Sequence, residues 1–198
     1  TYTEWISEKL KKGGTVGFDG KTVSIFNFRE MENKFMPKGI KINKGHDLIS
    51  EIWSDRPPIP AARVFIHDIK FTGLSAKDKI EKVRDEMKKL GAGNYLISSL
   101  DDIAWLFNIR GDDVSFISVT IAYALISMEK AYLFINLSKL PENVLTTLKE
   151  NDVEVLDYSA VKEKVEALSS EESIAFDIKK TNCWLYDAIP SGCRKVEI

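Results

Sequence analysis

The hydrophobic and polar positions of this chain alternate between the spacing typical of helices and that of strands. Between Ser75 and Gly91, four apolar side chains recur every three or four residues: Ile80, Val83, Met87 and Leu90. This period predicts an amphipathic helix. Ser75 and Asp78 approximate a capping box at its start, and Gly91 can end it.

The remaining pattern predicts interleaved helices and strands. Two apolar runs, Val119–Ser127 and Ala131–Asn136, flank Met128-Glu129-Lys130 and predict a β-hairpin. Further helices are predicted over residues 3–12, 24–35, 47–53, 141–150 and 159–168, with Thr3 and Ser159 as caps. Further strands are predicted over 15–19, 40–42, 64–66, 94–98, 153–156 and 174–177, the last being the final strand. We therefore expect an α/β fold with a mixed β-sheet of about five or six strands flanked by helices.

The order of elements suggests two related domains. The chain opens with a helix, the segment 15–22, an apolar helix and Pro37-Lys38-Gly39. It ends with the same order of elements: a helix, the segment 173–180, an apolar helix and Pro190-Ser191-Gly192. The proline-rich stretch 56–60 predicts a stiff linker between them. We expect residues 1–43 to be the C-terminal part of a preceding domain, 44–60 a linker and 61–198 a complete domain. The first part should pack through its large aromatic side chains: Trp5, Phe18, Phe28 and Phe35.

Composition and charge exclude several classes of protein. The chain is 44% hydrophobic and 29% charged, as in ordinary globular domains, and its net charge of −2 gives no reason to expect nucleic acid. No apolar stretch approaches the roughly 20 residues that span a bilayer, so no membrane partner is expected. Cys183 and Cys193 are too few for a disulfide framework and indicate reduced thiols in an intracellular, cytoplasmic protein.

Residues that could carry catalysis are scarce. His46 and His67 lack an HxH or HExxH partner, so no metal site is predicted. Cys183 lies beside Trp184 on an apolar stretch, which is typical of a buried, inert thiol. We therefore predict no catalytic residue and no cofactor in this chain.

The stretch Asp101–Val114 is the most informative. It begins as a short amphipathic run with acids in front, then turns at Asn108 to Asp113, where Arg110 lies among carboxylates. One interpretation is a solvated turn with local ion pairs. The other is a surface loop that meets a partner, with five candidate contact residues: Trp105, Asn108, Arg110, Asp112 and Asp113.

Four stretches of the chain resemble motifs of a known family, in the family's order. Residues 105–114, WLFNIRGDDV, resemble the "WLFNIRG-x-D" signature of the eukaryotic-type, three-domain aminopeptidase P family, also called Xaa-Pro aminopeptidases, of metallopeptidase family M24B. Residues 52–57 resemble its "IW-x-x-RP" linker, 72–80 its "TG-x-S-x-KDK" segment and 100–104 its "LD-[DE]-IA" segment. One departure is residues 117–123, ISVTIAY, which replace the family's "NPV-x-x-SY" and put the local loop shape in question.

The resemblance implies a non-catalytic middle domain of the creatinase/prolidase N-terminal type. In that family a C-terminal catalytic domain, which would follow Ile198, holds a dinuclear metal centre of Mn or Zn through two Asp, one His and two Glu. The resemblance implies that this chain alone is inactive and that it shapes the active-site entrance and the domain and dimer packing. The implied partners are the catalytic domain, a peptide with proline at its second position and, for the parent, a second copy in a homodimer.

On this reading the loop Asn108–Asp113 should face the catalytic domain, with Arg110 partly exposed or held by Asp112 or Asp113. A different class stays open: a catalytically inactive, peptidase-like module that binds peptides or histones.

Overall fold

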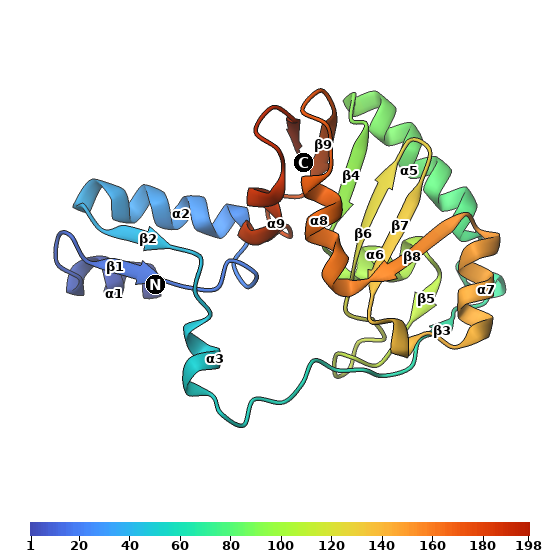
Figure 1. Ribbon diagram of the computed structural model, residues 1–198, viewed down its shortest axis with the longest axis horizontal. Helices are drawn as coiled ribbons and strands as arrows, with labels where there is room; N and C mark the ends of the chain where they lie inside the picture. The colour runs from blue at the N-terminus through green and yellow to red at the C-terminus, as the bar shows by residue number, and fades with distance from the viewer. The chain divides into compact units, whose positions relative to one another are not determined.

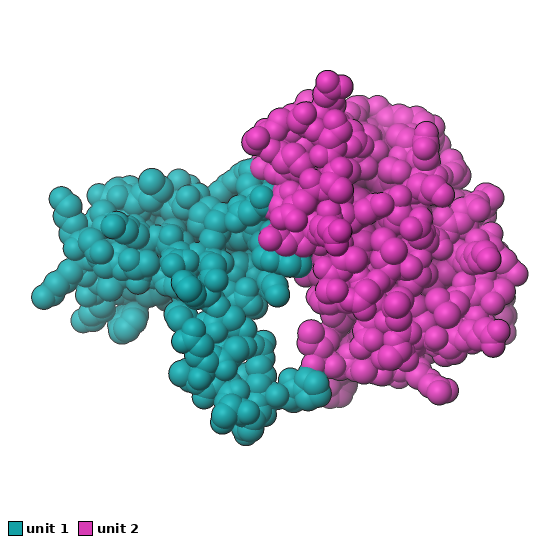
Figure 2. Space-filling view, viewed as in Figure 1, with its two compact units in different colours: residues 1–58, 178–187 teal, residues 59–177, 188–198 magenta.

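The computed structural model describes residues 1–198, which form two compact units (Figure 1). Unit 1 contains residues 1–58 and 178–187, and unit 2 contains residues 59–177 and 188–198 (Figure 2). The predicted division into 1–43, 44–60 and 61–198 stays a prediction, because compactness does not say where a domain copy begins.

Unit 2 is built on one mixed sheet. Its six strands lie in the order β10 (Arg194–Glu197), β9 (Ser173–Phe176), β4 (Asn94–Ile97), β6 (Ala122–Ser127), β7 (Ala131–Ile135) and β8 (Val153–Asp157). β10, β9 and β4 run parallel, β6 is antiparallel to β4 and to β7, and β7 and β8 are parallel. The predicted fold class, a mixed sheet of five or six strands flanked by helices, is confirmed.

Helices cover both faces of this sheet. One face carries α5 (Ala76–Leu90), α6 (Leu100–Leu106) and α7 (Glu142–Glu150), whose apolar side chains share one core with alternate residues of β6 and β7. The intervening residues of these strands face the other way, where Lys164 of α8 (Val161–Glu166) lies over the ring of Tyr132. Figure 1 shows α5 and α8 on opposite sides of the strands.

Short elements complete unit 2. A two-stranded antiparallel ladder joins β3 (Phe65–Ile66) to β5 (Ile109–Arg110), and α4 (Ile69–Thr72) follows β3. Two 3-10 turns, η2 (Leu137–Lys139) and η3 (Tyr158–Ala160), follow β7 and β8.

The predicted helix at Ser75 is confirmed in detail. Ser75 and Asp78 form the reciprocal capping box, and Gly91 ends the helix with a φ of 65°. A left-handed backbone is open to glycine at little cost, which explains the stop. Ile80 and Met87 are buried, as the period predicts.

Unit 1 is smaller and has its own core. It contains α1 (Tyr2–Lys9), β1 (Thr15–Gly17), α2 (Ile25–Phe35), η1 (Met36–Lys38), β2 (Lys41–Asn43), α3 (Leu48–Ile52) and most of α9 (Cys183–Ala188). β1 and β2 pair in parallel over a core of Met31, Phe35 and Ile40. Phe18 packs against this core and meets Phe28 edge to face. The expectation for Trp5 was wrong, since this side chain is 62% exposed.

Three local predictions were also wrong. Residues 174–177 do not hold the final strand, because β10 follows at the sheet edge. Its sequence RKVE has one apolar residue, and a charged edge strand gives little hydrophobic signal. Thr1, not Thr3, caps α1, and Asp157, not Ser159, accepts the capping bond of η3.

Candidate contact loop

The candidate loop begins where α6 ends. α6 has Asp101 and Asp102 in its first turn, where acids favour a helix N-terminus, and it buries Ile103 and Leu106 in the core. Its last carbonyl groups have no partner further along the helix, as at any helix end. Two cationic side chains supply those partners. Arg110 donates from Nη1 to the carbonyl of Ala104 at 2.7 Å, and Lys79 donates from Nζ to the carbonyl of Trp105 at 2.8 Å.

Charge makes this helix end favourable for cations. The C-terminus of a helix carries a partial negative charge, so lysine and arginine there are stabilised. Lys79 is 1% exposed, and burial, followed by the nearby charge of Arg110, lowers its pKa below the usual value for lysine. No carboxylate is among the partners of Lys79. Its ammonium also lies 4.7 Å from the centre of the Trp105 ring, a cation–π distance.

Asn108 forms the turn itself. Its φ of 54° lies in the left-handed region, which asparagine tolerates better than most residues. The side chain is used at both ends: Oδ1 accepts from Lys79 at 2.5 Å and Nδ2 donates to the carbonyl of Leu74 at 2.8 Å. The backbone carbonyl accepts from the amide of His67 at 2.7 Å. Two of the stretches recognised in the sequence, 72–80 and 105–114, therefore meet at Asn108.

Arg110 follows in β5, opposite Phe65 of β3. It is half-buried, and Nη1 also donates to the carbonyl of its neighbour Ile109 at 2.8 Å. Within residues 1–198 it makes no ion pair, although Asp112 and Asp113 are close in sequence. One edge of the guanidinium is thus occupied by backbone carbonyls, while Nε and Nη2 have no partner in this chain.

Asp113 belongs to a different, buried cluster. Its carboxylate is in contact with the ammonium of Lys139 in η2 and accepts from the hydroxyl of Thr120 at 3.0 Å and the amide of Ile121 at 2.7 Å. It also accepts from the amide of Ala62 at 3.3 Å. Burial acts to raise the pKa of Asp113, but the bonds from Lys139, Ile121 and Thr120 outweigh it and hold the pKa below its usual range.

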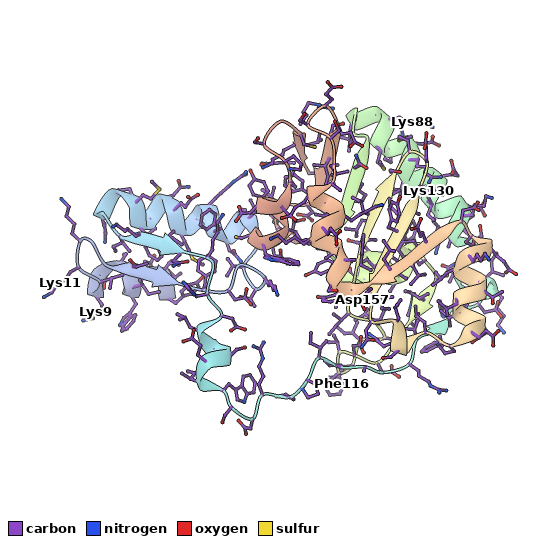
Figure 3. The ribbon with its side chains drawn as sticks, viewed as in Figure 1. Lys9, Lys11, Lys88, Phe116, Lys130 and Asp157 are labelled. Atoms are coloured by element: carbon purple, nitrogen blue, oxygen red, sulfur yellow. The ribbon has the colours of Figure 1, made fainter.

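The segment between Asp113 and Thr120 projects from this cluster. An antiparallel bridge between Val114 and Ile117 closes a tight turn, and Phe116 at its tip is fully exposed with a φ of 69° (Figure 3). Ile117 is exposed as well. Ile117 is also the first residue of the stretch 117–123, where the sequence departs from the aminopeptidase P pattern.

The five sequence-predicted residues thus have different environments. Trp105 is 48% exposed and covers Lys79, Asn108 is buried, Arg110 is half-buried and Asp112 is exposed. Asp113 is buried with Lys139. The structure brings Trp105, Asn108 and Arg110 together, whereas Asp112 and Asp113 lie outside that group. Their roles in contacting a substrate or domain stay predictions.

Two residues of this region were not among the candidates chosen from the sequence, Lys79 and Lys139, although Lys79 belongs to the recognised stretch 72–80. Lys79 had a detectable signal, because it stands on the apolar side of the helix, four residues before Val83. Lys139 had none, since a lysine in a short polar stretch normally faces water.

Other chemistry-bearing residues are dispersed. No three His, Cys, Asp or Glu side chains lie together in a geometry that could hold a metal ion. Cys183 is buried as predicted, and burial raises the pKa of its thiol to about 11. No helix is long and apolar enough to cross a membrane.

Unit 2 is thus an α/β domain with a mixed sheet. Buried polar interactions hold a surface loop at one end of α6 in this domain. A model of the creatinase/prolidase N-terminal domain matches residues 55–198, and the chain belongs to that family. The resemblance to aminopeptidase P is likewise confirmed.

Relatives and a solved structure agree with this assignment. The chain is 33% identical to Aminopeptidase P1 of Lotus japonicus, over 85% of this chain and 26% of that protein. It is 35% identical to the "Probable Xaa-Pro aminopeptidase P" of Leptosphaeria maculans, over 86% of this chain and 28% of that protein. The fold matches an X-prolyl aminopeptidase from Caenorhabditis elegans, described as a cytosolic enzyme with a di-nuclear active site, with a TM-score of 0.91 and 24% identity. That match covers all of this chain and 33% of the other, so the chain spans about a quarter to a third of such proteins.

Proposed function

We propose that this chain is a non-catalytic part of an Xaa-Pro aminopeptidase, an enzyme that removes an N-terminal residue preceding proline. The names of the relatives, which match over most of this chain, support the proposal. The dinuclear metal centre, of Mn or Zn, would be held by the catalytic domain of the parent, and this chain alone would be inactive. The parent would act in the cytoplasm as a homodimer.

Within that enzyme, the loop Trp105–Asp113 would contact the catalytic domain or the peptide near the active-site entrance. The observation that carries this proposal is Arg110, whose guanidinium has one edge fixed on α6 and the other without a partner. A planar guanidinium binds carboxylates through two parallel hydrogen bonds, so a carboxylate is the expected partner. That carboxylate would belong to the catalytic domain or to the peptide.

The test is kinetic and uses the full-length parent enzyme. Arg110→Ala should lower kcat/KM for Xaa-Pro peptides about tenfold or more, because a misplaced substrate or domain costs rate. Arg63→Ala is the matched control, since Arg63 is exposed in the same unit, and its kcat/KM should equal that of the wild type. Equal values for Arg110→Ala and wild type would contradict the proposal.

A second experiment separates an active parent from a catalytically inactive one. The full-length protein should release an amino acid from Xaa-Pro peptides in the presence of Mn²⁺ or Zn²⁺, while the 198-residue chain should release none under the same conditions. Release of an amino acid by the 198-residue chain would contradict its proposed inactivity. No release by the full-length protein would contradict the proposal that the parent is an active enzyme.

A further inference from the structure

Lys79 is a buried cation that the proposed function does not use. Its ammonium donates to the carbonyl of Trp105 and to the side-chain oxygen of Asn108, and it lies over the Trp105 ring. Burying an ammonium without a carboxylate is costly, and an apolar side chain of similar length would fill the same space. The presence of a lysine at this buried position therefore points to a role for its charge and its donors.

We infer that Lys79 is the positioning residue of the contact loop: it fixes the left-handed turn at Asn108 and thereby the direction in which Arg110 leaves α6. The consequence for catalysis rests on the function proposed above. The structural part can be tested by itself in the isolated chain.

The turn at Asn108 depends on its side chain being held. Asn108 donates to Leu74 and accepts from Lys79, so its amide group bridges the start of α5 to the end of α6. A left-handed backbone is tolerated by asparagine but still costs free energy relative to glycine, so contacts that hold the Asn108 side chain stabilise the turn. Without the ammonium, the side-chain oxygen of this buried asparagine loses its donor, and the turn loses one of its two anchors.

Lys79 also acts on Arg110 through the shared helix end. The two cations bind adjacent carbonyls, those of Trp105 and Ala104, and the pKa of Lys79 is lowered in part by the charge of Arg110. No carboxylate compensates these charges. An anion beside the outer edge of Arg110 would be attracted by both cations, because charges in a poorly solvated region interact strongly. Lys79 would therefore also strengthen carboxylate binding by Arg110.

The test compares Lys79→Met with Lys77→Met in the isolated chain. Methionine keeps the apolar length and removes the charge and the donors, and Lys77 is an exposed lysine two residues earlier on the same helix. Amide hydrogen exchange is followed by NMR at His67, whose amide is bonded to Asn108, and at Leu125 and Leu133 in the central strands.

In Lys79→Met, the amide of His67 should exchange about 10- to 100-fold faster, since a hydrogen bond to a charged group is lost. Exchange at Leu125 and Leu133 should change no more than in Lys77→Met. Unchanged exchange at His67 would overturn the inference. An equal increase at all three amides would also overturn it, because it would mean that Lys79 only adds global stability.

In the full-length enzyme, Lys79→Met and Arg110→Ala should be non-additive, with the double variant no slower than Arg110→Ala alone. Multiplying effects would refute the coupling. If Arg110→Ala alone has no effect, the proposed function fails, and the exchange experiment still decides the role of Lys79 in the turn.

Discussion

Two buried lysines, Lys79 and Lys139, contact different ends of the loop and have different kinds of partner. Both are 1% exposed. Lys139 is neutralised by Asp113 and bound to Thr120, in a cluster that joins Ala62, the projecting segment and η2. Lys79 has only carbonyl oxygens and a ring as partners. Lys139 thus completes an ion pair, whereas Lys79 leaves a net positive charge beside the half-buried Arg110.

The largest expected effect comes from breaking the paired lysine. Lys139→Met should lower the free energy of unfolding by about 3–5 kcal/mol, because Asp113 would remain as an uncompensated buried charge. Urea unfolding followed by circular dichroism measures this. The double variant Lys139→Met/Asp113→Asn is the control and should recover part of the loss, because the new amide is uncharged and its oxygen can still accept from Thr120 and Ile121. If Lys139→Met were as stable as the wild type, Lys139 would not be needed to neutralise Asp113, and the contrast with Lys79 would be wrong.

Acid should weaken the paired cluster of Lys139 and Asp113. The pKa of Asp113 is lower in the folded chain than in the unfolded chain. A group of this kind contributes stability that is present above its unfolded pKa, about 4, and that is lost as the pH falls through its folded pKa. Unfolding free energies of wild type should therefore decline below about pH 4 more steeply than those of Lys139→Met/Asp113→Asn, which lacks the titrating carboxylate. Parallel declines in the two proteins would show that Asp113 does not contribute.

The smallest effect concerns the tip of the projecting segment. Phe116→Gly should stabilise the chain by about 0.5–1 kcal/mol, because glycine accepts the φ of 69° and the exposed ring makes no packing to lose. Phe116→Ala is the matched control, since alanine keeps the backbone penalty, and its stability should stay near that of wild type. The readout is the urea midpoint at constant m-value. Equal midpoints for the glycine and alanine variants would show that the turn is not strained.

Sequence reasoning succeeded where the periodicity was strong and local. The helix between Ser75 and Gly91 and the hairpin around Met128–Lys130 were predicted correctly, because buried apolar positions and capping residues leave a periodic pattern in the sequence. It failed at β10 and at Trp5, where polar edges and exposed aromatic residues carry no such pattern.

The candidate loop was located from the sequence, but the hydrogen-bond and ion-pair partners of its side chains were not. Arg110 was expected to be partly exposed or to pair with Asp112 or Asp113. It is half-buried, in agreement with the first alternative, and it donates to the carbonyls of Ala104 in α6 and Ile109 in β5. Asp113 is held by Lys139, which the sequence did not indicate. The partners of the two lysines lie 19 or more residues away in the chain, so only the tertiary structure brings them together.

The central claim, that the loop Trp105–Asp113 contacts the catalytic domain or its peptide, is tested most directly by hydrogen exchange on two proteins. Exchange over residues 105–113 is compared between the isolated chain and the full-length parent, with and without an Xaa-Pro peptide, using residues 143–150 of α7 as the internal reference. Our account predicts slower exchange over 105–113 in the full-length protein or on addition of peptide, with the reference unchanged. Identical exchange over 105–113 in all three states would contradict it.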